Sequence, residues 1–339
     1  MLPLSSAQII SSMGSNIIRT FDWRHVALLA RVRDRGLCLD SQLAFTRGAH
    51  ALQNALLDPF IRGKSAITLV SRNGDIEAVG QCIYRSDAPN ARLSFFGPAE
   101  ALDSDAGLKL LESLAAAVGE HGAPNLIAEV DERSDAFERL RSAGFAVYAR
   151  QRIWRLIEAK EDFEPAEDDN WRFETVQSDI WRVEKTEDKI AAQSLFHNIV
   201  PGLVQQVEPP PTHPGHNLVY WREGELLGYL DVERGPLGTW IQPYFHPAVE
   251  GFQGLLGAHL KGVREDSPVY VCVRSYQSWM STPLERLWFE PAVDQAVMVK
   301  RLAIGVRSQV ASPLPAVEGT YPEPTAPIAR IEDPAGAYK

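Results

Sequence analysis

Histidine often binds metal ions, and four of the five histidines in the second half of the sequence are candidate ligands. They are His197, His213, His216 and His246. The spacing His213-Pro-Gly-His216 resembles a pair of metal ligands, but no cysteine or cluster of carboxylates completes a ligand set beside it. The surrounding prolines fix a loop rather than a coordination geometry. We therefore expect no metal site.

Glycine recurs three times where the chain leads into a predicted helix, at Gly251, Gly254 and Gly257. A helix N-terminus offers unpaired N–H groups and partial positive charge to an anion, and glycine lets the backbone approach it closely. Gln253 is polar, and Glu250 is the acidic residue of this stretch. The pattern predicts an anion-binding loop, with a plain turn before a helix as the alternative.

The composition is that of an ordinary globular protein. Of 339 residues, 45% are hydrophobic and 23% are charged, and the formal net charge is −10, which opposes a general attraction to nucleic acid or anionic lipid. Three cysteines without a CxxC pair fit a reducing compartment. The N-terminal residues do not resemble a signal peptide, and no stretch approaches the roughly 20 apolar residues of a membrane span. We expect a cytoplasmic protein without nucleic-acid or membrane partners.

Two segments divide the chain. The stretch Glu158 to Asn170 carries seven acidic residues and one lysine, which is typical of a solvated linker. Gly305 to Lys339 has six prolines and little apolar periodicity, which predicts a disordered tail. The sequence thus predicts two domains, residues 1–157 and 171–304, with a linker at 158–170 and a Pro-rich tail at 305–339.

Both predicted domains contain the order strand, turn, strand, loop, strand. In the first it is SAITLVSRNGDIEAVGQCIYRSDAPNARLSFFGP, with the hairpin signal Asn73-Gly74. In the second it is HNLVYWREGELLGYLDVERGPLGTWIQPYFHP, with Glu223-Gly224 at the turn. Gly80 and Gly228 fall at matching places in the second strand of each hairpin.

A helix, a buried strand, a second helix and a closing strand pair follow in each domain. The first helices are expected at Gly107 to Val118 and at about Gly254 to Val263, and the buried strands at Asn125 to Val130 and Val269 to Val273. Before the closing strands, Leu140 and Gly144-Phe145 correspond to Leu284 and Trp288-Phe289. A repeat distance of roughly 145 to 150 residues is typical of a duplicated domain.

This order of elements resembles the GNAT acetyltransferase superfamily over most of both domains. The most specific signature is the helix that leads into Gly144-Phe145 and a last strand finishing IWRL, and ERLWFEPAVDQAVMVKRL ends the second domain in nearly the same way. The resemblance implies an α/β fold with a mixed sheet in each of two tandem domains. It also implies that acyl-CoA lies where two central parallel strands splay apart, with its pyrophosphate on the N-terminus of the following helix.

The family's phosphate loop has the form Gln/Arg-x-x-Gly-x-Gly/Ala, and the first domain departs from it. Aligned on Gly107, Leu102 stands at the basic or amide position and Asp105 at the first glycine. Asp103 and Asp105 would repel a pyrophosphate, so we interpret them as helix-capping residues. The resemblance therefore places the better acyl-CoA cleft in the second domain. Its cofactor-binding residues there would be Tyr244, Phe245, Gly251, Gln253, Gly254 and Gly257, with backbone N–H groups near the first two polarising the thioester carbonyl.

Amine acylation needs a base for the ammonium proton and an acid for the leaving thiolate. Many family members use a tyrosine as the acid where this chain has Leu140 and Leu284, and an asparagine near the positions of Arg133 and Gln277. Tyr276 is the nearest substitute acid, and the alternative is an aromatic residue at a strand end.

The base candidates, Glu129 and Asp131, lie at the end of a buried strand, and the alternative for them is a pair of solvated carboxylates. Two functions follow from the resemblance. One is an acyl-CoA-dependent N-acyltransferase that uses acetyl-CoA or another acyl-CoA and acts on a small-molecule or peptide amine. The other is a catalytically inactive GNAT-like scaffold that binds a ligand or a protein. The sequence leaves the acceptor and the oligomeric state open.

Overall fold

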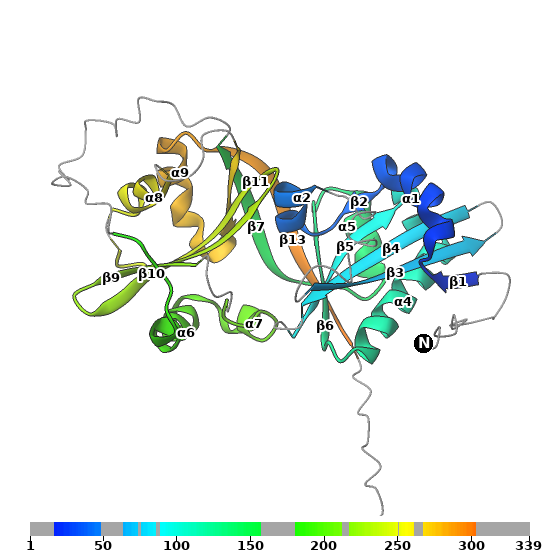
Figure 1. Cartoon of the computed structure of the whole chain (residues 1–339), viewed down its shortest axis with the longest axis horizontal. Coiled ribbons are helices and arrows are strands. Elements are labelled where there is room, and N and C mark those ends of the chain that lie inside the picture. The colour runs from blue at the N-terminus through cyan, green and yellow to red at the C-terminus, as the bar shows by residue number, and fades with distance from the viewer. Residues whose placement is uncertain are drawn as a thin grey trace, which may run out of the picture. The chain divides into compact units, whose positions relative to one another are not determined.

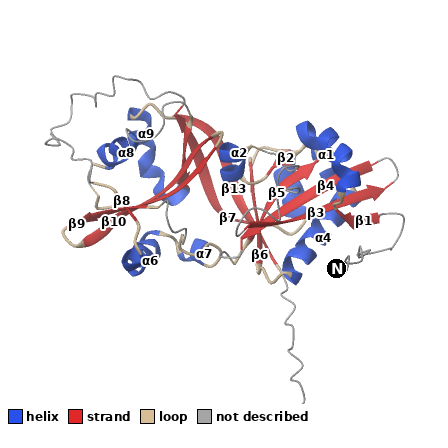
Figure 2. Ribbon diagram, in the orientation of Figure 1, coloured by secondary structure: helices blue, strands red, loops and turns tan. Residues whose placement is uncertain are grey.

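The computed structural model describes residues 17–48, 64–73, 76–85, 89–156, 180–211, 217–249, 251–260 and 267–302. These residues form one mixed sheet of 13 strands with helices packed on it (Figures 1 and 2). The strand order is β1-β3-β4-β5-β6-β13-β7-β12-β11-β10-β9-β8, and β2 pairs with β5. The predicted α/β class is confirmed. The predicted linker and tail lie outside the described residues, and the predicted domain boundaries stay a prediction.

We call residues 17–156 the first half and residues 180–302 the second half. The elements of the first half are β1 (Ile17–Thr20), α1 (Val26–Val32), β2 (Leu37–Cys38), α2 (Ser41–Arg47), β3 (Lys64–Asn73), β4 (Ile76–Arg85), β5 (Ala91–Gly97), α4 (Asp105–Glu120), β6 (Asn125–Val130), α5 (Asp135–Ser142) and β7 (Ala146–Leu156). Those of the second half are β8 (Arg182–Val183), α6 (Lys189–Ile199), α7 (Gly202–Gln205), β9 (Leu218–Arg222), β10 (Glu225–Gly235), β11 (Gly238–Phe245), α8 (Phe252–Leu260), β12 (Val269–Arg274), α9 (Ser281–Arg286) and β13 (Glu290–Arg301). None of the helices in these ranges is both long and apolar enough to span a membrane.

The predicted hairpins β3–β4 and β9–β10 are present, and each has a glycine at the same place. Gly80 lies opposite Phe96 of β5, and Gly228 lies opposite Phe245 of β11. A Cβ on Gly80 would come within 2.4 Å of a Leu114 methyl carbon, and one on Gly228 within 2.8 Å of the Phe245 ring. Close packing therefore explains both glycines, by helix α4 against Gly80 and by the third strand, β11, against Gly228.

Helices α5 and α9 also end alike. In each, the amide of a buried phenylalanine donates to the carbonyl of a buried leucine at 3.0 Å, and the residue before the phenylalanine has a positive φ. The corresponding residues are Leu140 and Leu284, Gly144 (φ 87°) and Trp288 (φ 65°), and Phe145 and Phe289. The predicted correspondence is thus confirmed, although Trp288 adopts a left-handed conformation that favours glycine.

The closing strand pair expected in each half is absent from the described residues, and each half instead ends in one long strand. The 11 residues of β7 contain no glycine, proline, asparagine or aspartate that would make a turn. The two strands are exchanged between the halves. Strand β7 pairs with β12 of the second half, and β13 pairs with β6 of the first. Figure 1 shows β7 and β13 running side by side, as their pairing requires.

The pairing of β7 with β13 is symmetric. Its centre is the pair Gln151↔Gln295, which are 144 positions apart in sequence. If each residue of the ladder is replaced by the residue 144 positions away, the same register is obtained, including both irregularities. For example, the pair Val147↔Met298 becomes the pair Trp154↔Pro291. Two similar halves therefore meet about a local twofold axis at the two glutamines.

Exchange of the closing strands makes the two hydrophobic cores interdependent. Ala296 and Met298 of β13 pack in the core under α4 and α5 of the first half. Trp154 and Leu156 of β7 pack in the core under α8 and α9 of the second half, where Trp154 is fully buried. Each half therefore completes the core of the other.

Candidate functional site

Both halves contain the predicted gap between central parallel strands. In the first half, β5 and β6 are paired only at Ala91↔Leu126 and Arg92↔Ile127. In the second half, β11 and β12 are paired only from Thr239↔Val269 to Ile241↔Val271. Each pair then diverges toward the carboxyl ends of its strands. We call these divergences the first-half gap and the second-half gap.

Backbone from the same chain fills the first-half gap. Strand β2 pairs with the far end of β5, at Leu37↔Phe96 and Cys38↔Phe95. The Leu39 amide then donates to the Ser94 carbonyl at 3.1 Å, and the Leu39 carbonyl accepts from the Glu129 amide at 2.9 Å. Leu39 is 2% exposed. A strand-like segment therefore joins β5 to β6 where the resemblance would place a pantetheine chain.

Buried charges hold this segment in place. Arg92 of β5 bonds to Asp40 at 3.1 Å and also to Glu129. The second oxygen of Glu129 accepts from the Ser41 amide at 2.8 Å. Burial alone would raise the pKa of Glu129, but the guanidinium groups of Arg92 and Arg274 hold this pKa below its usual range. Both Glu129 oxygens are thus committed to hydrogen bonds in the filled gap.

The start of α4 is also closed. Ser104 caps the helix by accepting from the Gly107 amide at 3.1 Å. The preceding 3-10 helix, Ala99–Asp103, packs so closely that a Cβ on Gly107 would lie 2.0 Å from the Ala101 carbonyl oxygen. Asp103 pairs with Arg139 at 2.5 Å, so the capping residue is Ser104 and not Asp103 as the sequence predicted. The remaining acidic residue, Asp105, lies in the first turn of α4.

In the part of the chain that the structure describes, one side chain bridges the second-half gap. Gln277 lies in the 3-10 helix Ser275–Met280 that follows β12, and its amide donates to the Pro243 carbonyl of β11 at 3.0 Å. This bond shows that Pro243 directs its carbonyl toward β12. Neighbouring residues of a strand direct their backbone groups to opposite edges, so the Phe245 N–H points into the gap and that of Tyr244 points toward β10. The His246 amide, which bonds to the Leu227 carbonyl of the hairpin at 2.9 Å, fits this alternation.

Polar atoms without partners cluster beside this gap. Among the described residues, the Gln277 Oε1, the Tyr276 hydroxyl, and the Nε and Nη1 atoms of Arg274 are buried and have no hydrogen-bond partner. A buried polar group left unpaired costs about 1–3 kcal/mol. Three such residues within four positions of sequence carry a cost in folding that a ligand would offset by pairing with them. This is the feature of the second half that fits a bound acyl-pantetheine chain.

An ionic pair of the second half, which also bonds to a tyrosine of the first half, neighbours these atoms. Arg274 is 3% exposed, and its Nη2 donates to Glu208 at 2.5 Å. The hydroxyl of Tyr148, on β7, donates to the same Glu208 oxygen at 2.5 Å. Burial raises the pKa of Tyr276, so its phenol stays protonated at neutral pH.

Helix α8 carries the predicted glycine loop. Gly251 has φ 75° and precedes the helix, whereas Gln253, Gly254 and Gly257 lie within it. The first intrahelical bond from this loop joins the Leu255 amide to the Gly251 carbonyl at 3.1 Å. Helix geometry leaves the amides before Leu255 without an intrahelical acceptor. Gln253 and Gly254 are half-buried, so the predicted anion-binding position is partly accessible.

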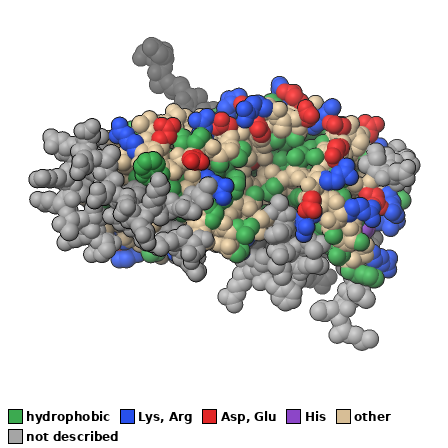
Figure 3. Space-filling view, turned by 90° about the horizontal axis from the view of Figure 1, so that it is seen from above, with side chains coloured by type: hydrophobic (Ala, Val, Ile, Leu, Met, Phe, Trp, Pro, Cys, Tyr) green, Lys and Arg blue, Asp and Glu red, His purple; other side chains and the backbone are tan. Residues whose placement is uncertain are grey.

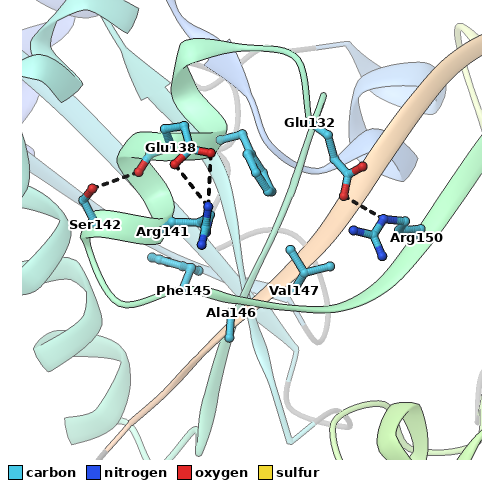
Figure 4. Close-up of a pocket in the computed structure, with 9 residues that line it drawn as sticks. Glu132, Glu138, Arg141, Ser142, Phe145, Ala146, Val147 and Arg150 are labelled. Carbon is cyan, nitrogen blue, oxygen red and sulfur yellow. Dashed lines mark hydrogen bonds and ion pairs between the residues drawn. The ribbon is translucent and has the colours of Figure 1, made fainter.

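A groove of 910 Å³ lies outside the gaps, between α5 and the start of β7 (Figure 4). Its charged side chains already pair with one another. Arg150 bonds to Glu132 at 2.7 Å, and Arg141 bonds to Glu138 at 3.2 Å, as the close-up shows. Figure 3 likewise shows acidic and basic side chains interspersed on one face of the molecule. This groove therefore lacks the unpaired basic groups that a phosphate site would need.

The histidines and the second base candidate are separate from the gaps. His197 is exposed and bonds to the Gln193 carbonyl at 2.6 Å, and His246 accepts from the Ala248 amide at 3.2 Å. His213 and His216 lie outside the described residues. Within those residues, no three His, Cys, Asp or Glu side chains form a metal-binding group. The amide and side chain of Arg133 hold the pKa of Asp131 below its usual range.

Sequence reasoning missed Arg92, Arg274 and Glu208. The first two offered a signal, since each is a charged residue in an otherwise largely apolar strand that is buried in the sheet. Glu208 offered none, because it lies in a proline-rich loop far from both strands in sequence.

No protein-family model matches this sequence, and no curated protein matches it. The structure is similar to that of a tandem GNAT protein from the clavulanic acid biosynthesis pathway, with 14% identity, 84% of this chain and 98% of that chain covered, and a TM-score of 0.49. It is similar to a GCN5-related N-acetyltransferase from Sphaerobacter thermophilus, with 13% identity, 86% and 97% coverage, and a TM-score of 0.49. A third similar structure is a putative acetyltransferase from Pyrococcus horikoshii, with 11% identity, 88% and 94% coverage, and a TM-score of 0.45. The GNAT-like description of this fold rests on the chain's own topology.

Proposed function

We propose that this chain is an acyl-CoA-dependent N-acyltransferase whose working cleft is the second-half gap, with the first half serving a structural role. One observation carries the proposal. The first-half gap is closed by backbone hydrogen bonds of Leu39, whereas among the described residues the second-half gap is bridged by the side chain of Gln277. A side chain can rotate away to admit a ligand, but a strand-like segment cannot leave without unpairing its neighbours.

The polar atoms at the second-half gap support this assignment. An acyl-pantetheine chain carries amide groups that can accept from and donate to strand edges. Its amide N–H would replace the Gln277 amide on the Pro243 carbonyl. The Phe245 N–H would donate to the thioester carbonyl and stabilise the charge that develops there. The open amides before Leu255 in α8 would face the pyrophosphate.

Acyl transfer also needs an acid that protonates the leaving thiolate. The acceptor amine, after its ammonium proton has passed to solvent, attacks the thioester carbon, the carbon–sulfur bond breaks, and the thiolate takes the proton of the Tyr276 hydroxyl. The proton that the amine nitrogen loses restores the phenol. Tyr276 suits this role because its buried phenol carries a proton at neutral pH and its hydroxyl has no hydrogen-bond partner among the described residues. We assign Glu129 to closure of the first-half gap rather than to base catalysis.

A non-catalytic scaffold is the second candidate. Pro243 lacks the N–H that another residue would present to the second-half gap, and Gln277 already occupies its carbonyl. Binding of acetyl-CoA without turnover of any amine would favour this alternative over the enzyme.

Calorimetric titration with acetyl-CoA tests the proposal. Gly254→Trp places a large side chain in the first turns of α8 and should weaken binding by roughly tenfold or more, which is about 1.4 kcal/mol. Asp105→Trp is the matched control, since it changes the exposed first turn of α4 beside the closed gap and should leave the affinity unchanged.

Circular dichroism would establish that both variants are folded. Absence of binding by the wild-type protein at millimolar acetyl-CoA would refute the proposal. Equal affinities of the wild type and Gly254→Trp would move the binding site elsewhere.

A further inference from the structure

A second pocket, of 470 Å³, lies at the local twofold axis between the halves. Gln151 and Gln295, the central pair of the β7–β13 ladder, both line it, and their side chains bond to each other at 2.9 Å. Its walls come from the segment that follows β6, from β7 and β13, and from the end of β12 with the segment that follows it. The pocket therefore exists only because the two halves are joined.

The pocket wall is almost entirely polar. Val273 is the single apolar residue among the described residues that line it. Three arginine–carboxylate pairs alternate around the wall, namely Arg133–Asp131 at 3.4 Å, Arg150–Glu132 at 2.7 Å and Arg152–Asp294 at 2.6 Å. The hydroxyl-bearing side chains Ser275, Ser278 and Ser281 lie on the same wall.

The inner wall joins the pocket to the proposed acyl site. Arg274 and Ser275 line the pocket, and the next two residues are Tyr276 and Gln277 of the second-half gap. Arg274 brings a fourth guanidinium to the wall. Its carboxylate partner, Glu208, does not line the pocket.

We propose that this pocket binds the acyl acceptor, and that the acceptor is a small zwitterion of the α-amino-acid type. This inference rests on the proposed function and names its substrate class. The amino and carboxylate groups of such a molecule are attached to the same carbon. One arginine and its neighbouring carboxylate in the wall can therefore pair with both of these charges at once. The serine hydroxyls and the two glutamines then offer hydrogen bonds to the remainder of the molecule.

Other acceptor classes fit less well. A ligand with only a negative charge would meet three carboxylates on the wall, and one with only a positive charge would meet four guanidinium groups. An apolar amine would lose the hydration of these groups and gain contact with Val273 alone. The volume lies within the range of small-molecule sites, about 300–1,000 Å³.

Calorimetry without acetyl-CoA tests the pocket by itself. The probes are glycine, L-serine and L-glutamine, each measured beside its amide, which lacks the carboxylate, and its N-acetyl derivative, which lacks the charged amine. At least one free amino acid should bind roughly tenfold more tightly than both of its derivatives, because each derivative loses one charge-assisted interaction.

Two variants tie this binding to the pocket. Asp294→Asn removes a carboxylate of the wall whose side chain is 55% exposed, and Ser278→Trp fills the pocket from an exposed position. Each should weaken amino-acid binding by roughly tenfold or more. Glu138→Gln is the control, because Glu138 also pairs with an arginine but lines only the groove on α5.

The outcomes separate this inference from the proposed function. The pocket assignment is wrong if no amino acid binds at a concentration on the order of 10 mM, if the derivatives bind equally well, or if Asp294→Asn and Ser278→Trp behave like Glu138→Gln. If acetyl-CoA binds and any of these results is obtained, the pocket assignment is wrong but the proposed function is not contradicted. Amino-acid binding by a protein that does not bind acetyl-CoA would instead contradict the proposed function and leave an amino-acid site in place.

Discussion

The two halves form the same gap by the same strand topology and then fill it differently. In the first half, Leu39 accepts from β6 and donates to β5, as a strand would, and Arg92 ties Asp40 and Glu129 together beneath it. In the second half, the equivalent space is crossed by one hydrogen bond from Gln277. The gap is thus a property of the fold, whereas its accessibility depends on a few residues that follow β12 or precede α2.

This difference shows how a repeated domain can specialise. The first half has a filled gap and a buried ionic cluster. The second half has unpaired polar atoms that folding alone does not explain. Unsatisfied polar groups in a native structure often mark a functional site, because a ligand can supply the missing partners.

The largest expected effect on the free energy of unfolding comes from a substitution in the closed first-half gap. Glu129→Gln keeps the size of the side chain but leaves Arg92 facing a neutral group, and it should lower the free energy of unfolding by about 3 kcal/mol. Asp294→Asn breaks an arginine pair at the surface and should cost less than about 1 kcal/mol. Urea denaturation at pH 7 measures both.

Low pH should reduce the difference in the free energy of unfolding between the wild type and Glu129→Gln. The pKa of Glu129 is lowered in the folded protein, so its contribution to stability is present above the unfolded value, near 4.3, and is lost as the pH falls through the folded value. The stability gap between the wild type and Glu129→Gln should therefore shrink below about pH 4. An unchanged gap at that pH would show that the carboxylate charge does not hold the segment.

A second pair of variants distinguishes the two ways of filling a gap. Leu39→Pro removes the N–H that bonds to Ser94 and should cost about 3 kcal/mol, whereas Gln277→Ala removes one side-chain bond and should cost about 1 kcal/mol. Equal costs of the two variants would contradict the comparison.

Much of this fold could be predicted from the sequence, because its landmarks act locally. The turn Glu223-Gly224 has positive φ at both residues, as a two-residue hairpin requires, and the Gly-Phe and Trp-Phe endings follow from the end of a helix. The exchange of β7 and β13 could not be predicted in this way, since it is a long-range pairing that no local motif in either strand marks.

The candidate site was predictable only in outline. The glycine loop of α8, the Phe245 amide and Tyr276 were marked by residue type and by resemblance. The filling of the first-half gap was not, because Leu37 to Ser41 reaches β5 and β6 from more than 50 residues away in sequence and carries no motif. Long-range pairing of this kind depends on the whole tertiary structure.

Hydrogen exchange with and without saturating acetyl-CoA tests the difference between the two gaps most directly. The account predicts slower exchange at the Phe245 amide, in the first turn of α8 and in residues 274–280, with no change in residues 37–41 and 91–107 of the first half. Protection in the first half, or no protection in either gap, would contradict it.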